Sequence, residues 1–458
     1  MTTAPEPAKP GRYLVVGSGM AAAACARALL ADGSEVTVLD RAETAGTADL
    51  AAAGARVVIA HPAPLSLLDD VDEVIVSPGV PPHDPLAAAA VKAGLDVYSE
   101  PELAWRRRGP GAAPWLALTG TNGKTTTVTM VASILRAAGR RTEALGNIGV
   151  PLVASAEDLD AVAVELSSFQ LHWSSRMAPP IAAVLNLADD HLEWHLTFDA
   201  YAGAKFEIWR DPDCVAIGNA DDPRVAAALN AAGRRAIWFT LGAPDRGAFG
   251  VSDGWLVDNA TEDRPVRLIE ASRIRPSGQH NVANALAAAA MTRAYGVTVE
   301  AVRDGLAGYV PEPHRNAPVA EVAGVAYVDD SKATNPHAAL GSLLAYPSIV
   351  WVAGGQLKGV DVTEMVVAVA PRLRGAVLLG TDRAEIAAAL ARHAPDVPVV
   401  DVPDTDDGAM RAVVTAAARL ARPGDTVLLA PAAASKDMYT SYSARGDAFA
   451  RAVAELPA

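Results

Sequence analysis

The stretch WLALTGTNGKTTT, residues 115–127, limits the possible fold more than any other part of the chain. Its apolar run 115–118 predicts a buried strand, a glycine turn follows, and Lys124 opens a helix that runs to about Ala138. Glycines let backbone N–H groups converge on an anion, and the N-terminus of the helix adds its dipole. The stretch therefore predicts a cradle for the phosphates of a nucleoside triphosphate, made of Gly120, Thr121, Asn122, Gly123, Lys124, Thr125 and Thr126.

This cradle is the short GxxGK[ST] core of a phosphate loop, because Leu118 stands where the full motif has a glycine. Lys124 supplies a mobile positive charge, and the hydroxyl of Thr125 can coordinate Mg²⁺. The alternative is an ordinary strand, turn and helix with a surface lysine, and the flanking pattern disfavours it.

Length, composition and charge narrow the class of protein. A chain of 458 residues suggests about three domains, and 51% apolar residues with 20% charged residues are typical of a globular protein. The formal charge of −14 disfavours nucleic acids and anionic membranes as partners. Cys25 and Cys214 are the only cysteines, which excludes a disulfide framework. No secretory signal or membrane-spanning stretch is recognisable, so we expect a cytoplasmic protein without membrane insertion.

The first segment predicts a nucleotide-binding βαβ unit over residues 12–40. An apolar strand leads into a G-x-G-x-x-A pattern that contains Gly19, and Asp40 ends the second strand. NAD and other nucleoside diphosphates both remain candidate ligands. Ser77 and Gly79 follow a later strand, at the edge where open α/β sheets bind ligands, although Gly79 could simply form a turn.

After a linker at residues 106–114, a second segment places several polar side chains beyond apolar strands. Glu165 ends a buried strand and could hold a metal ion, although alone it would be a strand-end charge. His191 lies in an acidic loop, as a metal ligand or as a solvated residue. Lys205 lies on a helix over 199–210, and solvent exposure is its expected state.

Helical spacing brings Asn281 and Asn284 to one face of a long helix, where their amides could bind a purine. N-capping is the alternative for Asn281. A third segment then alternates strands and helices to the C-terminus and predicts a second doubly wound sheet. Its candidate site residues all follow strands and are Asp330, Lys332, Thr334, Lys358 and Ser435.

The sequence thus predicts an α/β protein of three domains. We expect a Rossmann-like domain over residues 1–111, a central phosphate-loop ATPase domain with a mostly parallel sheet over 112–310, and a second Rossmann-like domain over 311–458.

Five motifs occur in order along the chain: GTNGKTT, ELSSFQL, GQHNVANALA, PHR and DDSKATN. Together they resemble the Mur ligase family of peptidoglycan synthesis, over essentially the whole chain. The GxG-type first domain and the DSKATN string resemble in particular the branch that joins D-glutamate to UDP-N-acetylmuramoyl-L-alanine. The resemblance implies an ATP- and Mg²⁺-dependent amide ligase that converts the alanine carboxylate into an acyl phosphate, which the amine of D-glutamate attacks.

The resemblance also implies roles for individual residues. Lys124 would hold the β and γ phosphates, Thr125 and Glu165 one Mg²⁺, and His191 with a carbamylated Lys205 a second. The further residues implied around ATP are Asn281, Asn284, Arg315 and Asp330. Those implied around the UDP-linked substrate are Gly19, Asp40, Arg41, Ser77, Gly79, Asn147, Ser167 and Gln170. Those implied around D-glutamate and the transferred phosphate are Lys332, Thr334, Lys358, Ser435 and Tyr442.

Two of these positions depart from the family pattern. Arg41 stands where some relatives carry a small hydroxyl residue, and Tyr442 stands where a phenylalanine is common. Lys436 also replaces a residue that is often apolar.

Three other functions compete with this interpretation. Another three-domain amide ligase, such as the muramate:L-alanine ligase or folylpolyglutamate synthase, would share the ATP core but not the DSKATN string. An NAD-dependent oxidoreductase would leave the phosphate loop unexplained, and a non-catalytic nucleotide switch would give Glu165, His191 and Lys205 no purpose. We expect the chain to be a monomer.

Overall fold

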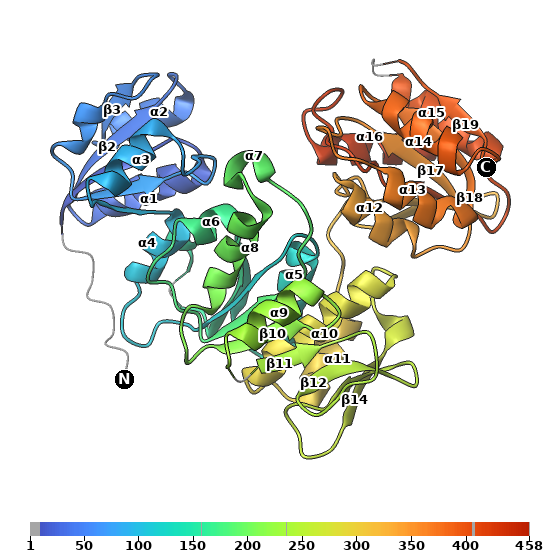
Figure 1. Cartoon of the computed structure of the whole chain (residues 1–458), viewed down its shortest axis with the longest axis horizontal. Helices are drawn as coiled ribbons and strands as arrows, with labels where there is room; N and C mark the ends of the chain where they lie inside the picture. The colour runs from blue at the N-terminus through green and yellow to red at the C-terminus, as the bar shows by residue number, and fades with distance from the viewer. Residues whose placement is uncertain (1–9, 157, 235, 405–407, 458) are drawn as a thin grey trace. The chain divides into compact units, whose positions relative to one another are not determined.

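The computed structural model of the chain describes residues 10–156, 158–234, 236–404 and 408–457. It divides into two compact units, coloured along the chain in Figure 1. The first unit runs to Ala271 and also contains Asn284–Gly308, and the second contains Ser272–Ala283 and the chain from Tyr309 on. In the described part of the chain no helix is long and apolar enough to cross a membrane.

The first sheet of the first unit has five parallel strands in the order β3-β2-β1-β4-β5. Strands β2 and β3 continue the sheet on one side of β1, and β4 and β5 continue it on the other. The direction of the strand order therefore reverses between β1 and β4, which is where ligands of such sheets bind. The strands are β1 Arg12–Val16, β2 Glu35–Asp40, β3 Arg56–Ile59, β4 Glu73–Val76 and β5 Asp96–Tyr98. The helices are α1 Met20–Ala31, α2 Ala45–Ala52, α3 Pro85–Lys92 and α4 Glu100–Arg106.

The passage to the next sheet begins one residue later than the sequence indicated. Arg106 belongs to α4 and is largely buried, because its guanidinium bonds Asp96 at 2.8 Å and Glu102 at 3.0 Å. The irregular segment that leads to the phosphate loop therefore starts at Arg107.

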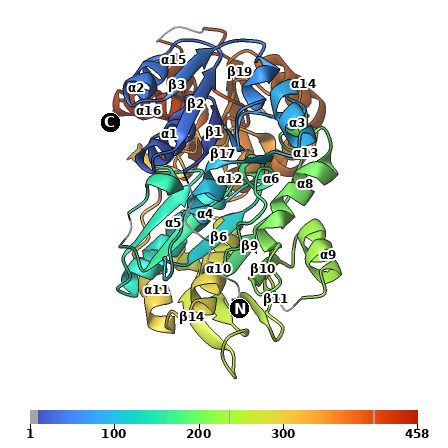
Figure 2. The same ribbon diagram turned by 90° about the vertical axis from the view of Figure 1, so that its left-hand side faces the viewer.

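The second sheet has nine strands in the order β14-β13-β12-β11-β10-β9-β6-β8-β7, with antiparallel pairing only at β12-β13-β14. Its strands are β6 Trp115–Thr119, β7 Thr142–Gly146, β8 Ala161–Glu165, β9 Ile181–Val184, β10 Val215–Asn219, β11 Ala236–Phe239, β12 Ala248–Ser252, β13 Trp255–Asp258 and β14 Val266–Glu270. Its helices are α5 Lys124–Ala137, α6 Ser168–His172, α7 Leu192–His195, α8 Phe198–Phe206, α9 Pro223–Ala231, α10 Gln279–Ala294 and α11 Val299–Ala307. In Figure 2, α5 and α11 lie on one side of strands β6, β9 and β10, and α8 and α9 lie on the other.

The second unit contains a six-stranded sheet in the order β15-β16-β20-β17-β18-β19, parallel except for the edge strand β15. Its strands are β15 Ala317–Val322, β16 Val325–Asp329, β17 Ile349–Gly354, β18 Leu373–Leu379, β19 Val399–Asp401 and β20 Thr426–Leu429. Its helices are α12 Pro336–Leu343, α13 Thr363–Val369, α14 Arg383–His393, α15 Ala409–Leu420 and α16 Tyr442–Ala454. The α/β fold with three mostly parallel sheets confirms the prediction from the sequence.

One N-capping pattern, an Asp or Asn followed by a proline, begins a helix beside each sheet. Asp84, Asp222 and Asn335 each precede a proline and accept hydrogen bonds from backbone N–H groups of the first turn. Proline is favoured there because its fixed φ suits a helix and its missing N–H would have no partner within the helix.

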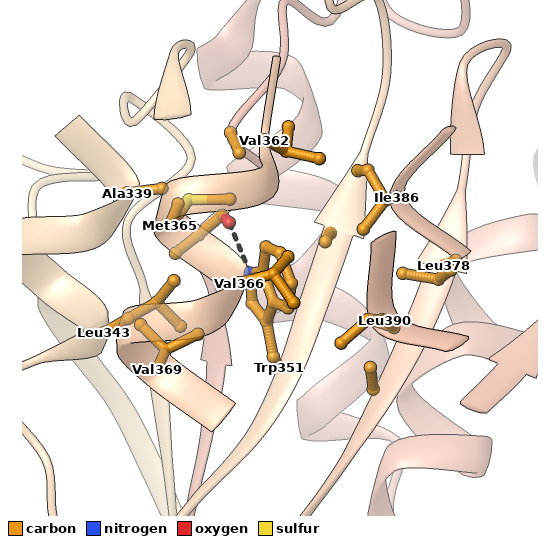
Figure 3. Packing of buried hydrophobic residues seen from close by; sticks show 14 of the residues in the cluster. Ala339, Leu343, Trp351, Val362, Met365, Val366, Val369, Leu378, Ile386 and Leu390 are labelled. Carbon is orange, nitrogen blue, oxygen red and sulfur yellow. Dashed lines mark hydrogen bonds between the residues drawn. The ribbon is translucent and has the colours of Figure 1, made fainter. Parts of the chain in front are cut away.

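The core of the second unit surrounds Trp351 on β17, which is fully buried (Figure 3). Its indole N–H donates to the carbonyl of Ala430 at 2.8 Å, so the one polar atom of the side chain is satisfied. Residues of α13, including Met365 and Val366, pack on one side, and Ile386 and Leu390 of α14 on the other. This core fixes the sheet whose strand ends carry candidate site residues.

Helices α5 and α11 approach so closely that a side chain at Gly305 would force their backbones apart. A Cβ at this position would lie 2.4 Å from Cα of Ile134, and Ser133 Oγ donates to the carbonyl of Gly305 at 2.7 Å. We expect Gly305→Ala to lower the free energy of unfolding by about 2 kcal/mol, because the backbones must separate. Denaturant unfolding measures the change.

Gly203→Ala is the matched control. Gly203 is an exposed glycine inside α8 with no atom within 4 Å of a Cβ. Alanine there should raise stability by about 1 kcal/mol through helix propensity. Equal effects of the two substitutions would contradict the close contact between α5 and α11.

Candidate active site

Two lysine ammonium groups meet at one carbonyl of the phosphate loop. Lys124 Nζ donates to the carbonyls of Gly120 at 2.9 Å and Thr121 at 2.8 Å, and Lys205 Nζ donates to the same Gly120 carbonyl at 2.9 Å. Lys205 also lies 3.3 Å from Thr119 Oγ1. Two like charges at one oxygen repel each other, so this geometry favours loss of one proton or the arrival of an anion.

The expectation that Lys205 is solvent-exposed is wrong. The residue is 2% exposed, because α8 packs against the strand end that precedes the loop. Burial, followed by the charge of Lys124, lowers the pKa of the Lys205 amine well below its usual value, although Asp190 and Glu165 act in the opposite direction. The protonated form of this amine is therefore less favoured than that of an ordinary lysine.

Glu165 lies beside the loop because β8 is a direct neighbour of β6. Its carboxylate is buried and accepts hydrogen bonds from Thr125 Oγ1 and Asn147 Nδ2, at 2.8 and 2.9 Å. The end of β7 can lie this close to Glu165 only because residue 146 is a glycine with φ of +109°. A Cβ there would lie 2.2 Å from the carbonyl oxygen of Glu165. The structure thus brings together three residues that the sequence placed on separate segments.

The described residues contain no group of three His, Cys, Asp or Glu side chains arranged to hold a metal ion. Mg²⁺ prefers hard oxygen ligands and keeps several waters. The adjacent oxygens of Thr125 and Glu165 fit that preference. His191 lies against the ring of Phe169, with 4.6 Å between ring centroids, and its nearest carboxylates are Asp190 and Glu193, at 3.5 and 3.7 Å.

Asn186, which follows β9, supports the loop and was not among the predicted site residues. Its Oδ1 accepts from the N–H of Asn122 at 2.8 Å, and its Nδ2 donates to the carbonyl of the same residue at 3.0 Å. Its own carbonyl accepts from the N–H of Thr121 at 2.9 Å. The position after a strand adjacent to the loop was the one available signal.

Asn284 and Thr126 complete the surroundings of the loop in the first unit. Gly123 has φ of +80°, and a Cβ there would lie 2.3 Å from Oδ1 of Asn284. Thr126 is buried in the first turn of α5.

In the first sheet, the candidate site residues lie at the carboxyl ends of the strands. Ser18 Oγ donates to Asp40 at 2.5 Å, and Ser77 Oγ donates to the carbonyl of Val16 at 2.7 Å. Burial raises the pKa of Asp40, but hydrogen bonds from Ser18 and the following N–H groups outweigh it, so the pKa is lowered and the group is an anion at neutral pH.

The remaining candidates of this edge are less constrained. Gly19 is the N-cap residue of α1, and no atom lies within 4 Å of a Cβ built on Gly19 or Gly79. Arg41 is exposed, and its N–H bonds the Asp40 carboxylate at 2.6 Å.

Ser167 and Gln170 form a capping box on α6. Ser167 Oγ accepts from the N–H of Gln170, and the Gln170 carbonyl oxygen accepts from the N–H of Ser167. Both side chains therefore have a structural role whatever they bind.

In the second unit, α10 begins at Gln279, so Asn281 is not its N-cap. Asn281 instead donates to the carbonyl of Ser277 at 3.2 Å. Asp330 is buried and accepts from Asn316 N at 3.0 Å and Ser342 Oγ at 2.5 Å. Burial raises the pKa of Asp330 to about 7 despite these bonds. Arg315 lies 3.4 Å from Glu312.

The other candidates of this unit follow three adjacent strands. Lys332 and Thr334 follow β16, Lys358 follows β17, and Ser435 follows β20. Lys332 Nζ stands 4.1 Å from the centre of the Tyr442 ring, a cation–π distance.

Three family models match the chain in order. The N-terminal model of the MurD-like Mur ligases matches residues 11–99, the Mur ligase middle domain 118–292, and the Mur ligase glutamate ligase domain 314–433. The chain belongs to the Mur ligase family. Among curated relatives, the UDP-N-acetylmuramoylalanine–D-glutamate ligases of Streptomyces avermitilis and Thermobifida fusca are 52% and 50% identical. Each alignment covers 97% of this chain and 98% of the relative.

Solved structures of other Mur ligases share the fold. UDP-N-acetylmuramate-alanine ligase MurC from Thermotoga maritima is 18% identical with a TM-score of 0.56, over 92% of this chain and 95% of that one. MurF from Acinetobacter baumannii is 20% identical with a TM-score of 0.57, over 94% and 89%. At these identities the likeness establishes the fold alone.

The two hydrogen bonds between the Asn186 side-chain amide and the backbone of Asn122, here called the amide clamp, lead to a prediction about nucleotide affinity. Asn186→Ala removes two hydrogen bonds that hold the turn of the phosphate loop. We expect binding of Mg–ATP to weaken about tenfold, equivalent to about 1.4 kcal/mol, as measured by titration calorimetry.

Asn219→Ala provides the control. Asn219 ends the neighbouring strand β10 and donates to the carbonyl of Leu185 at 2.8 Å, so its substitution also removes a side-chain bond to the backbone. Equal weakening by both substitutions would show that the clamp has no special role.

Proposed function

We propose that this chain is an ATP-dependent ligase that adds D-glutamate to UDP-N-acetylmuramoyl-L-alanine. The carrying observation is the convergence of Lys124, Lys205, Thr125 and Glu165 around one phosphate loop. The names of the curated relatives, at 50% identity or more over nearly their whole length, support the choice of substrates.

The proposed reaction needs a carboxylate to become an electrophile. Transfer of the γ-phosphoryl group to the alanine carboxylate forms an acyl phosphate and ADP. The D-glutamate amine then attacks the acyl carbon, an amide bond forms as the nitrogen gives up one proton, and phosphate leaves with the electron pair of the broken C–O bond. Lys124 is suited to hold the transferred phosphoryl group, because its ammonium is the mobile cation of the loop.

We infer that Thr125 and Glu165 hold Mg²⁺, and that His191 and Lys205 serve a second site. When bound, the ion supplies charge neutralisation at the phosphates. A lysine ammonium has no lone pair for a metal, and Mg²⁺ prefers an oxygen ligand to a neutral amine. A neutral Lys205 amine can add to CO₂ to form a carbamate and release one proton, which replaces a repelled cation by an oxygen ligand.

The domains divide the substrates in this proposal. Residues 1–111 bind the UDP moiety, residues 112–310 bind ATP, and residues 311–458 bind D-glutamate. The carboxyl-end placement of Asp40 and Ser77 in the first sheet, and of Lys332, Lys358 and Ser435 in the last, supports it. A monomeric state and a cytoplasmic location stay predictions from the sequence.

The decisive experiment measures phosphate release from Mg–ATP with UDP-N-acetylmuramoyl-L-alanine and one amino acid at a time. We expect release with D-glutamate and none with L-glutamate, L-alanine or no amino acid. Release with L-alanine and UDP-N-acetylmuramate would instead identify an earlier ligase. Release in none of the mixtures would favour a non-catalytic nucleotide switch.

Lys124→Ala should lower kcat by at least 100-fold with little change in Tm, because the lysine acts on developing charge rather than on packing. Lys92→Ala is the control, since Lys92 is an exposed lysine in the last turn of α3. Substantial turnover by Lys124→Ala would refute the assigned role.

Carbamylation of Lys205 is testable without activity. The protein incubated with ¹³C-bicarbonate at neutral pH should show a carbamate carbon signal, because a lowered pKa gives this amine a larger unprotonated share than an ordinary lysine has. The signal should vanish in Lys205→Met and persist in Lys92→Ala. A signal that survives Lys205→Met would assign it to another group.

A further inference from the structure

Arg445, in the first turns of α16, is among the largest fully buried side chains of the described chain, with 1% exposure. A buried arginine normally pairs with a carboxylate. Within the described residues, no carboxylate oxygen forms an ion pair with it. Burial lowers the pKa of its guanidinium to about 10, which still leaves it charged at neutral pH.

The guanidinium bonds neutral acceptors at the ends of three separate strands. Its Nε donates to Ser331 Oγ at 2.9 Å, and its Nη2 donates to the Ser331 carbonyl at 2.8 Å. Its Nη1 donates to the carbonyls of Ala433 at 3.1 Å and Gly354 at 3.3 Å. Since β16, β20 and β17 are neighbours, one planar group spans the carboxyl ends of three consecutive strands.

These three loops carry the candidate residues for the amino acid. Ser331 directly precedes Lys332, Gly354 opens the loop that reaches Lys358, and Ala433 precedes Ser435 by two residues. Two of the loops are also bonded to each other, since Gln356 and Ala434 exchange N–H to carbonyl bonds, each of 2.9 Å. The position of each candidate side chain therefore depends on the same guanidinium.

The neighbour of Arg445 is equally constrained. A Cβ at Gly446 would lie 2.2 Å from Nδ1 of His314 and 2.5 Å from a carboxylate oxygen of Asp329. The Nδ1 of His314 is 2.6 Å from that oxygen. Asp329 itself stands immediately before the loop that contains Ser331. The first two turns of α16 thus fit closely under the strand ends.

We propose that Arg445 is a positioning residue of the amino-acid site, which holds the loops after β16, β17 and β20 in one arrangement and places a fixed positive charge beneath them. The proposal rests on the proposed function for the identity of the amino acid. Arg445 is too deeply buried to touch a substrate, so it acts through the loops. The charge is fixed because the guanidinium stays protonated at neutral pH: although burial lowers its pKa, Asp437 and Asp329 act in the opposite direction without forming an ion pair with it.

The test compares Arg445→Lys and Arg445→Met with the wild-type chain in the full reaction. A lysine keeps the charge but lacks the planar fork that reaches three loops. We expect Arg445→Lys to raise the KM for D-glutamate at least tenfold and leave the KM for UDP-N-acetylmuramoyl-L-alanine within twofold, with a larger rise in Arg445→Met. Parallel changes in both KM values, or no change, would overturn the proposal.

Hydrogen exchange gives a readout that needs no activity. Amides of residues 330–335, 354–358 and 431–436 should exchange faster together in Arg445→Lys. Leu390→Ala is the control, because it removes a buried core side chain of the same unit on α14 and leaves the guanidinium bonds intact. Its destabilisation should not single out the three loops. Loop-specific exchange without ligase turnover would retain the positioning role and reject the proposed reaction, whereas exchange confined to one loop would reject the positioning role.

Discussion

The electrostatics of the phosphate loop depend on one carbonyl oxygen, that of Gly120, which accepts hydrogen bonds from two lysines. Lys124 reaches it from the start of helix α5, and Lys205 reaches it from a second helix, α8. Two ammonium groups held so close cannot both stay charged at little cost. The fold therefore places two positive charges that repel each other. A phosphate at Lys124 and a chemical change at Lys205 would both reduce this repulsion.

Much of this organisation follows from the sequence because it depends on strand ends. In parallel sheets, residues that follow neighbouring strands meet at one edge, so the strand-end position of Glu165, together with the family resemblance, indicated a place near the phosphate loop. The burial of Lys205 could not be predicted in the same way. A lysine on a helix is normally solvated, and only the packing of α8 against the end of β6 removes it from water.

Asn186 and Arg445 escaped prediction for a different reason. Most of their hydrogen bonds go to backbone carbonyls or N–H groups, which every residue possesses, so the sequence gives little indication of these partners. The distribution of lysines along the sequence is a further indication of the site. The chain has seven lysines, and Lys124, Lys205, Lys332, Lys358 and Lys436 all lie in or beside the segments that carry candidate site residues. Arginine provides most other positive charge, so a lysine here marks a place where a compact ammonium is wanted.

The close contact of α5 and α11 has a consequence at the level of the gene. Any missense change in a glycine codon introduces a Cβ, and at position 305 that atom would meet the backbone of Ile134 rather than a movable side chain. Helix α5 begins at the phosphate loop, so a displacement of its far turns is a displacement of the element that anchors Lys124. Codon 305, which encodes no candidate site residue, is thus a place where a substitution would disturb the helix that carries Lys124.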